Sequence, residues 1–186
     1  IAAWLDKANR SGAVFGSPSF SVGSMAALAF CSLQASENLS NVNAKVFATV
    51  RYHAKIRMEA SEGQHAITLK KMLATLVSRE DRDLVAALRC CLLFELKDVG
   101  LKKAGEALRQ GAPFKGVVVE AMLVSGQFGG EAEKKVLEGY LNNPDRYAVF
   151  SQNKKTFTTT VGDVALAVLW TMYDIDPTEK GFADGV

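Results

Sequence analysis

The sequence predicts an all-α protein, a short α-solenoid of two-helix repeats with a small non-helical insertion before the last helix. The first observation is a lysine pair inside an apolar helical segment, which occurs three times with a spacing of 32 residues. The pairs are Lys70 and Lys71, Lys102 and Lys103, and Lys134 and Lys135. Fixed periods of about 20 to 50 residues are typical of stacked repeats, in which each unit buries its apolar face against its neighbours. Helical spacing of apolar residues and glycines at regular boundaries are the other two observations.

The composition is that of an ordinary globular chain. Of its 186 residues, 48% are hydrophobic and 23% are charged, which allows a core and argues against general disorder. The formal net charge of +2 is too small to favour nucleic acid or an anionic membrane as the partner. No apolar run approaches the roughly 20 residues of a transmembrane segment. Because the chain begins at Ile1, we expect an upstream region or a removed leader, and the compartment stays open.

The first sixty residues are expected to cap the repeats. Helical spacing predicts helices over about 1–10, 21–35 and 40–58. These segments match the 32-residue pattern poorly, and atypical terminal units are expected where a repeat array must be capped.

Residues 61–143 carry the repeats, and in each repeat a glycine-marked turn separates two helices. Asp98 to Gly100 is the turn expected in the middle unit, and Gly129-Gly130 is the turn expected in the next. The helices predicted around these turns are 83–97, 101–109, 114–128 and 131–141.

Glycine, asparagine and proline mark the ends of these units. Gly111 and Asn143 are placed to close the second helices, as residues that tolerate a left-handed conformation do. Pro113 and Pro144 follow 31 residues apart, each where a new element is expected to begin.

The pattern breaks after Asn143. Residues 147–159 are rich in β-branched and aromatic side chains, which predicts a small β-hairpin or an ordered loop connected through Gln152 to Lys155. Thr160 to Asp163 resembles a capping box with aspartate in place of the usual glutamate, and it opens a final helix. We therefore expect residues 144–186 to cap the array, and residues 1–186 to form a single domain.

The two-helix units over about 45–142 resemble the short type of HEAT-like repeat. The segment Thr158 to Ala167, followed by Asp176-Pro177 and Gly181-Phe182, is similar to the C-terminal end of HEAT-like proteins of planctomycete bacteria. The resemblance implies an α-solenoid that binds other proteins or belongs to a larger assembly, and it implies no reaction. The Asp and Arg positions of the HEAT consensus are not evident here, so the repeat class stays open.

Two surfaces are candidates for partner binding. If the repeats stack, the six lysines of the repeated pairs form a column that faces either an acidic protein surface or a phosphate backbone. A solvated outer face is the preferred interpretation, because Glu106 and Glu138 follow Lys102 and Lys134 by four residues and partly neutralise them. The second candidate is aromatic and consists of Tyr147, Phe150 and Phe157, which either cover the last repeat, as we prefer, or form a docking surface.

Enzyme chemistry finds little support in the cysteines and histidines. A thiol-dependent enzyme would need His53 or His65 to lie beside Cys31, Cys90 or Cys91, as the base beside its nucleophile. No glycine motif for an oxyanion hole accompanies them, and adjacent cysteines in an apolar helix are typically buried and inert.

The acidic residues are also explained more simply by structure. Asp174, Asp176 and Asp184 lack the loop glycine and final glutamate of a calcium site, so helix termination is the preferred interpretation. Asp163 near Trp170 is compatible with a HEAT-like DNA glycosylase, but the low net charge disfavours it.

The function we expect is a non-enzymatic protein-binding or scaffold repeat domain with no catalytic residue, cofactor or metal. A nucleic-acid-binding HEAT-like module is the first alternative, and a thiol-dependent enzyme is the second.

Overall fold

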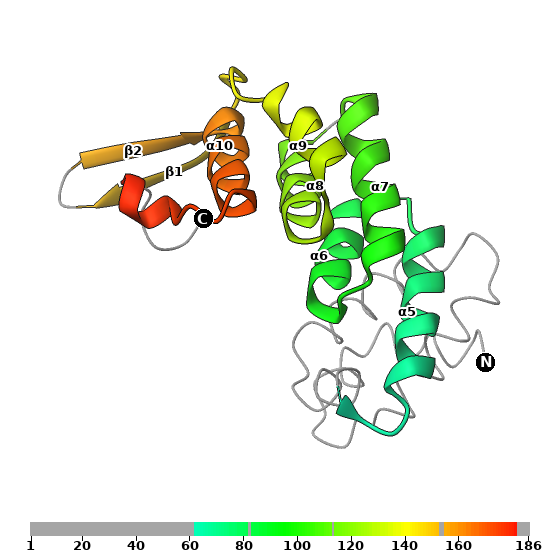
Figure 1. The fold of residues 1–186 in the computed structure, drawn as a ribbon. Coiled ribbons are helices and arrows are strands. Elements are labelled where there is room, and N and C mark those ends of the chain that lie inside the picture. Colours follow the sequence, from blue (N-terminus) through cyan, green and yellow to red (C-terminus); the bar gives the residue numbers. More distant parts are fainter. Residues whose placement is uncertain (1–61, 82, 113, 153–154, 182–186) are drawn as a thin grey trace. The chain divides into compact units, whose positions relative to one another are not determined.

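The structure, a computed structural model, describes residues 62–81, 83–112, 114–152 and 155–181 (Figure 1). These residues form six α-helices, one two-stranded sheet and a short 3₁₀ helix. The predicted capping helices of the first sixty residues lie outside the described ranges. The described part is therefore mostly helical, as predicted, whereas the solenoid arrangement stays a prediction.

The chain divides into two compact units between Val99 and Gly100, a boundary that lies inside helix α7 (Lys97–Gln110). In the first unit, helices α5 (Ala66–Arg79) and α6 (Leu84–Phe94) pack against each other. Their apolar faces are buried, with Leu69, Leu73, Leu76 and Val77 on α5 and Ala87, Leu88, Cys90, Cys91 and Phe94 on α6. Asparagine, aspartate and serine caps satisfy free N–H groups at helix starts, and Asp83 does so for α6 by accepting a hydrogen bond from the Ala86 N–H.

The turn predicted at Asp98 to Gly100 is wrong. Helix α6 ends at Phe94, because Glu95 adopts a left-handed conformation with φ of 54° and the Leu96 N–H donates to the Cys91 carbonyl. This six-to-one hydrogen bond is the usual closure of a helix whose next residue is left-handed. Gly100 is instead buried within α7, so the second helix begins at Lys97 rather than at residue 101.

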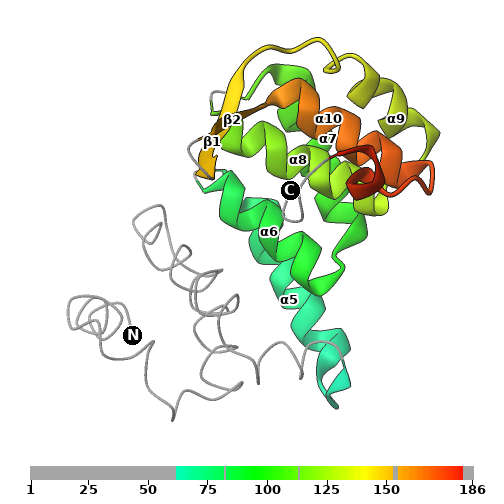
Figure 2. The same ribbon diagram turned by 90° about the vertical axis from the view of Figure 1, so that its left-hand side faces the viewer.

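Three helices form the core of the second unit. Helices α8 (Lys115–Phe128), α9 (Glu131–Glu138) and α10 (Val161–Met172) contact one another (Figure 2). Most of α8 is apolar and buried, which suits a helix covered on several sides. Gly126 allows α10 to come close, because a Cβ at this position would lie only 2.4 Å from Cγ1 of Val168.

Local signals predicted several boundaries in this unit correctly. Helix α8 and the Gly129-Gly130 turn lie where they were expected. Gly111 closes α7 with φ of 67°, and the Ala112 N–H donates to the Ala107 carbonyl, as in the usual glycine-terminated helix.

The predicted end of α9 is wrong. The helix was predicted to reach residue 141, but it stops at Glu138, and the N–H groups of Tyr140 and Leu141 turn back to carbonyls three residues earlier. Asn143 therefore caps no helix, and its side chain accepts instead from the Asp145 N–H at 2.9 Å. Pro144 precedes a strand, which its missing N–H also permits.

Residues 146–160 form the β-hairpin that was one of the two predicted alternatives. Strands β1 (Arg146–Gln152) and β2 (Lys155–Thr160) are antiparallel. Gln152 pairs with Lys155, so the connection between the strands is two residues long. The connecting residues, Asn153 and Lys154, lie outside the described ranges. A bulge between Arg146 and Ala148 shifts the register near the base.

The predicted capping box is confirmed at the start of α10. Thr160 Oγ1 accepts from the Asp163 N–H at 3.1 Å, and Asp163 Oδ2 accepts from the Thr160 N–H at 2.7 Å. After α10, a short 3₁₀ helix, η2 (Pro177–Lys180), follows where the sequence predicted only the end of the helix and a tail.

Candidate interaction surface

The hairpin is exposed on both faces. Every described side chain from Arg146 to Ser151 and from Thr156 to Thr158 is exposed. The apolar ones are among them, since Tyr147, Val149 and Phe157 are 38%, 48% and 44% exposed. Side chains that covered a helix would be largely buried, which these three are not, and docking by this segment stays a prediction. Phe150 is the register partner of Phe157, and its side chain lies outside what the structure describes.

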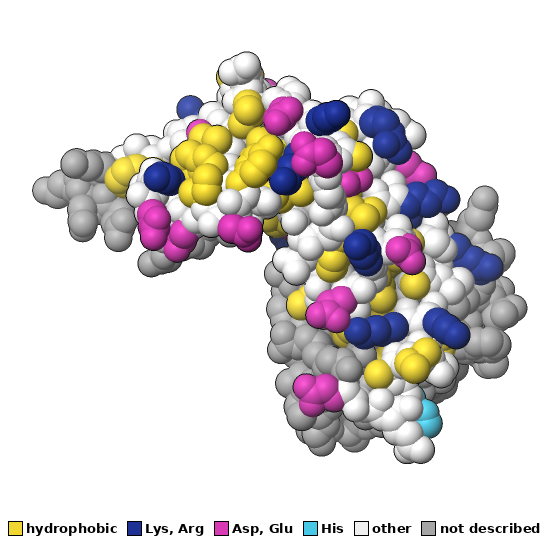
Figure 3. Space-filling view, viewed as in Figure 1, with side chains coloured by type: hydrophobic (Ala, Val, Ile, Leu, Met, Phe, Trp, Pro, Cys, Tyr) yellow, Lys and Arg dark blue, Asp and Glu magenta, His cyan; other side chains and the backbone are white. Residues whose placement is uncertain are grey.

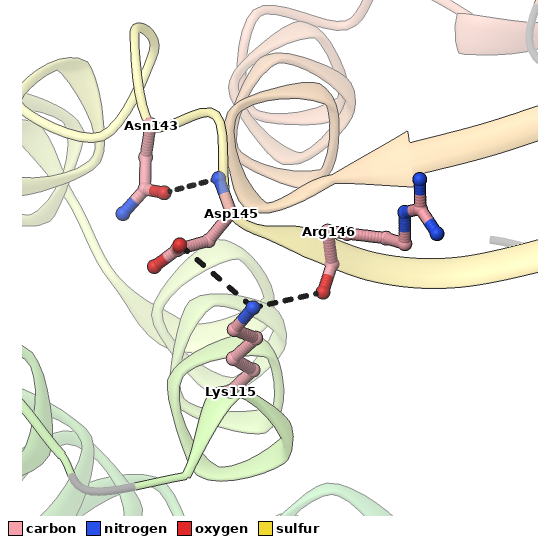
Figure 4. A network of polar contacts seen from close by, with 4 residues as sticks. All are labelled: Lys115, Asn143, Asp145 and Arg146. Carbon is pink, nitrogen blue, oxygen red and sulfur yellow. Dashed lines mark hydrogen bonds and ion pairs between the residues drawn. The ribbon is translucent and has the colours of Figure 1, made fainter.

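Side-chain contacts hold the base of the hairpin to α8 (Figure 4). Lys115, the first residue of α8, donates to the Arg146 carbonyl at 3.2 Å, and its Nζ lies 3.7 Å from Asp145 Oδ1. Asn143 orders the same turn through its bond to the Asp145 N–H. These groups are half exposed or more, so the ion pair contributes at most about 1 kcal/mol. Its effect is to orient the hairpin.

Backbone contacts fix the same base to α10. The Val161 N–H donates to the Asp145 carbonyl at 2.9 Å, and the Gly162 N–H donates to the Asn143 carbonyl at 3.0 Å. Only glycine fits at position 162, because a Cβ there would lie 2.5 Å from the Leu141 carbonyl oxygen. The hairpin thus has a fixed base and an exposed body.

The lysine pairs do not present equivalent surfaces. Lys71, Lys102 and Lys135 are exposed, Lys70 and Lys134 are partly buried, and Lys103 is buried with 6% exposure. Basic and acidic side chains alternate over the visible face of α7 and α9 (Figure 3). The six lysines therefore differ in exposure and do not resemble a uniform column. Partner binding by the exposed lysines stays a prediction.

Two of the lysines make contacts within the protein. In the first unit, Lys70 Nζ pairs with Glu95 Oε2 at 3.3 Å. In the second, Lys134 pairs with Glu131 at 3.6 Å rather than with Glu138, the partner suggested by the sequence, and its Nζ lies 4.0 Å from the centre of the Tyr173 ring. This cation–π contact holds the end of α10 against α9.

A hydrogen bond joins two residues that are separated by the 32-residue period of the sequence pattern. The Tyr140 hydroxyl donates to the Leu108 carbonyl at 2.6 Å, and the two residues are 32 positions apart. Leu108 is near the end of α7, where helix carbonyls lack intrahelical partners. Burial raises the pKa of Tyr140.

The described cysteines do not favour thiolate chemistry. Cys90 and Cys91 are buried, and burial, followed by the neighbouring Cys91, raises the pKa of the Cys90 thiol. Reactive cysteines need a lowered pKa and access to solvent. His65 is exposed at the start of α5, while Cys31 and His53 lie outside the described residues.

Two of the acidic candidates, Asp176 and Asp163, have structural partners. Asp176 caps η2 by accepting from the N–H and hydroxyl of Thr178, and these bonds lower the pKa of the Asp176 carboxyl. Asp163 forms the capping box. Within the described ranges, which exclude Asp184, no cluster of three or more His, Cys, Asp or Glu side chains is arranged to hold a metal. Nor does any helix in those ranges have the length and apolar character to span a bilayer.

Sequence reasoning missed several residues that build this surface. Val149 was available from the alternation of strand residues, since it lies two positions from Tyr147. Lys115 and Asp145 had no such signal, because their contact depends on α8 and β1 meeting in space. Tyr140 and Leu108 occupy the same position of the 32-residue pattern, but the hydrogen bond between them depends on the tertiary structure.

Comparisons with known proteins add no relative. No family model, curated protein or solved structure matches the chain. The likeness to HEAT-like repeats and to planctomycete proteins therefore stays a prediction from the sequence.

Proposed function

We propose that this protein is a non-enzymatic protein-binding domain, in which the helical repeats carry the hairpin as the contact surface. The observation that supports this proposal is the exposure of Tyr147, Val149 and Phe157 on a hairpin whose base is held by α8 and α10.

An exposed two-stranded hairpin needs a further source of stability. A lone two-stranded hairpin is marginally stable in water and usually gains stability from a third strand or from packing. Here the fixed base provides order, while the body keeps its apolar side chains in solvent. Aromatic side chains supply a large contact area at low entropic cost, and tyrosine is enriched at the energetic centres of interfaces. A protein partner would remove this surface from water.

Site-specific photocross-linking tests this proposal in the cells that make the protein. Benzoylphenylalanine replaces Tyr147 or Phe157 in separate variants, and a matched control replaces Ile67, an apolar residue of α5 that is 74% exposed. We expect both hairpin variants to form an adduct with one common polypeptide, and the Ile67 variant to form none with it. Equal adducts from all three positions, or none from the hairpin, would contradict the proposal.

Charge reversal distinguishes partner binding by the hairpin from partner binding by the exposed lysines. Glutamate replaces Lys71, Lys102 and Lys135 together, and binding of the cross-linked partner is then measured at low and high salt. We expect binding and its salt dependence to change little. A large loss would move the contact surface to the lysines, and tight binding of duplex DNA with a steep salt dependence would favour the nucleic-acid alternative.

A further inference from the structure

We infer that the hairpin binds an acidic, extended polypeptide segment, which adds as a third strand along β2. This inference rests on the proposed function and specifies the chemistry of the partner. It rests on three observations: the net charge of the hairpin, the lack of a further strand at its two edges, and the positions of its apolar residues on both faces.

The hairpin segment has a net positive charge. Residues 146–160 contain Arg146, Lys154 and Lys155 and no acidic residue. Since the whole chain has a formal net charge of only +2, the remaining residues are net negative. Arg146 begins β1 at the base of the hairpin, and Lys155 begins β2 at the opposite end. A complementary segment therefore carries acidic residues near both of its ends.

Each strand of the hairpin has one edge without a strand neighbour. The sheet consists of β1 and β2 alone in the part of the chain that the structure describes. An unpaired edge offers a row of N–H and C=O groups to an incoming chain. Extended peptides bind in this way in many complexes, where main-chain hydrogen bonds supply affinity and side-chain contacts supply specificity.

The edge of β1 is less suited to this than the edge of β2. The bulge between Arg146 and Ala148 interrupts its register, and bulges blunt an edge against further pairing. Lys115 also donates to the Arg146 carbonyl. By contrast, β2 pairs without a shift from Lys155 to Thr159 and is rich in threonine, which favours extended structure.

Apolar residues lie on both faces of the hairpin. Val149 pairs with Thr158, and the next position, Phe157, pairs with Phe150. Successive residues of a strand point to opposite faces, so Val149 and Phe157 are on opposite faces. A third strand places alternate side chains against each face. The expected segment is thus about six to eight residues long, with apolar or β-branched residues between acidic ends.

A nucleic acid fits these features less well. Phosphate backbones are tracked by clusters of lysine and arginine, whereas Arg146 and Lys155 begin the two strands at opposite ends of the hairpin, and the strand residues between them are uncharged. A short single strand of DNA is therefore included as a competing probe.

The test uses the full chain with three synthetic peptides and the single strand of DNA. The first is an acetylated, amidated octapeptide with the order Glu-Glu-Val-Thr-Val-Thr-Glu-Glu. The second has lysine in place of each glutamate, and the third is the acidic peptide N-methylated at each of its four central residues. We expect the acidic peptide to bind at least about ten-fold tighter than either of the others, because several exposed charge pairs and the main-chain bonds act together.

Hydrogen–deuterium exchange then locates the bound peptide. We expect slower exchange over residues 155–160 and little change over 146–152. A variant with Lys154→Glu and Lys155→Glu is expected to lose the preference for the acidic peptide. The matched control, with Lys102→Glu and Lys135→Glu on the helices, is expected to keep it.

Each contrary result overturns the inference. These results are no binding of the acidic peptide, equal binding of the lysine or N-methylated peptide, protection on β1 instead of β2, and tighter binding of a fifteen-nucleotide oligothymidylate. In each of these cases, the adducts from positions 147 and 157 decide separately whether the proposed protein-binding function survives. The two proposals therefore fail on different measurements.

Discussion

Tyr140 shows how one side chain connects two segments that are far apart in the sequence. Its ring is partly buried, and its hydroxyl satisfies the Leu108 carbonyl near the end of α7. A hydrogen bond of this kind contributes about 0.5–1.5 kcal/mol, and leaving the carbonyl without a partner removes that contribution.

The first prediction concerns this hydroxyl. Tyr140→Phe removes it without changing the shape of the ring, and we expect the free energy of unfolding to fall by about 1 kcal/mol. Tyr147→Phe is the matched control, because it removes a hydroxyl from the exposed hairpin, and we expect a change within about 0.5 kcal/mol. Urea titration followed by circular dichroism measures both. Equal effects of the two substitutions would show that the bond to Leu108 does not matter.

The second prediction is the pH dependence of the same residue. Burial raises the pKa of Tyr140 in the folded protein, so the folded state binds its proton more tightly than the unfolded state. The contribution to stability is therefore fully present below the unfolded pKa of about 10, and it is lost as the pH rises through the folded pKa. We expect the Tyr140→Phe variant to lose less stability than the original protein between neutral and strongly alkaline pH. Identical pH profiles would argue against the raised pKa.

At the scale of elements, the close approach of α8 and α10 organises the second unit. Gly126 has no side chain where Val168 of α10 packs, and a Cβ would lie 2.4 Å from Val168 Cγ1. Val168 is buried, so it has little room to move.

The third prediction follows from this contact. Gly126→Ala raises helix propensity by up to about 1 kcal/mol, but we expect net destabilisation of about 1–3 kcal/mol because the helices must separate. Gly105→Ala in α7 is the matched control. Its Cβ would meet only the end of the exposed Arg109 side chain, at 3.2 Å, and we expect a neutral or stabilising effect. Thermal unfolding measures both.

A compensating variant checks the cause of the third prediction. Val168→Ala removes the methyl group that would collide with the new Cβ. The double variant Gly126→Ala with Val168→Ala should therefore be less destabilised than the sum of the two single changes. Strict additivity would mean that the clash is not the cause.

For the whole molecule, the buried cysteines report on opening of the core. Cys90 and Cys91 are on the buried face of α6, and the raised pKa of Cys90 keeps the thiolate scarce near neutral pH. Reagents reach such groups only when the surrounding structure opens.

The fourth prediction concerns alkylation of these thiols by iodoacetamide at pH 8. We expect modification of Cys90 and Cys91 in the native protein to be slower than in the unfolded chain by about 1,000-fold or more, the factor for an opening free energy of ~4 kcal/mol. Peptide mass spectrometry locates and times each adduct. Rapid and selective modification of Cys90 or Cys91 under native conditions would revive the thiol-dependent alternative.

Boundaries set by local chemistry were predicted well. The Thr160–Asp163 capping box, the left-handed Gly111 and the limits of α8 depend on groups only a few residues apart. Hydrogen bonds and backbone preferences over such short separations are encoded in the sequence itself.

Boundaries at which local preferences compete with packing were not predicted correctly. Gly100 was predicted to lie in a turn, but it is buried inside α7. The residue that adopts the left-handed conformation and ends α6 is Glu95. The helical period predicted that α9 would continue to residue 141, yet the chain leaves the helix after Glu138 and turns toward the hairpin.

Sequence patterns were sufficient to predict the mostly helical composition of the described residues, the hairpin as one of two options, and the capping box and glycine cap. The burial of Lys103, the contact of Lys115 with the base of the hairpin and the exposure of the described hairpin side chains became visible only in the folded protein. The physical reason is that caps and turns depend on neighbours along the chain. Burial and long-range contacts depend instead on which elements meet in space.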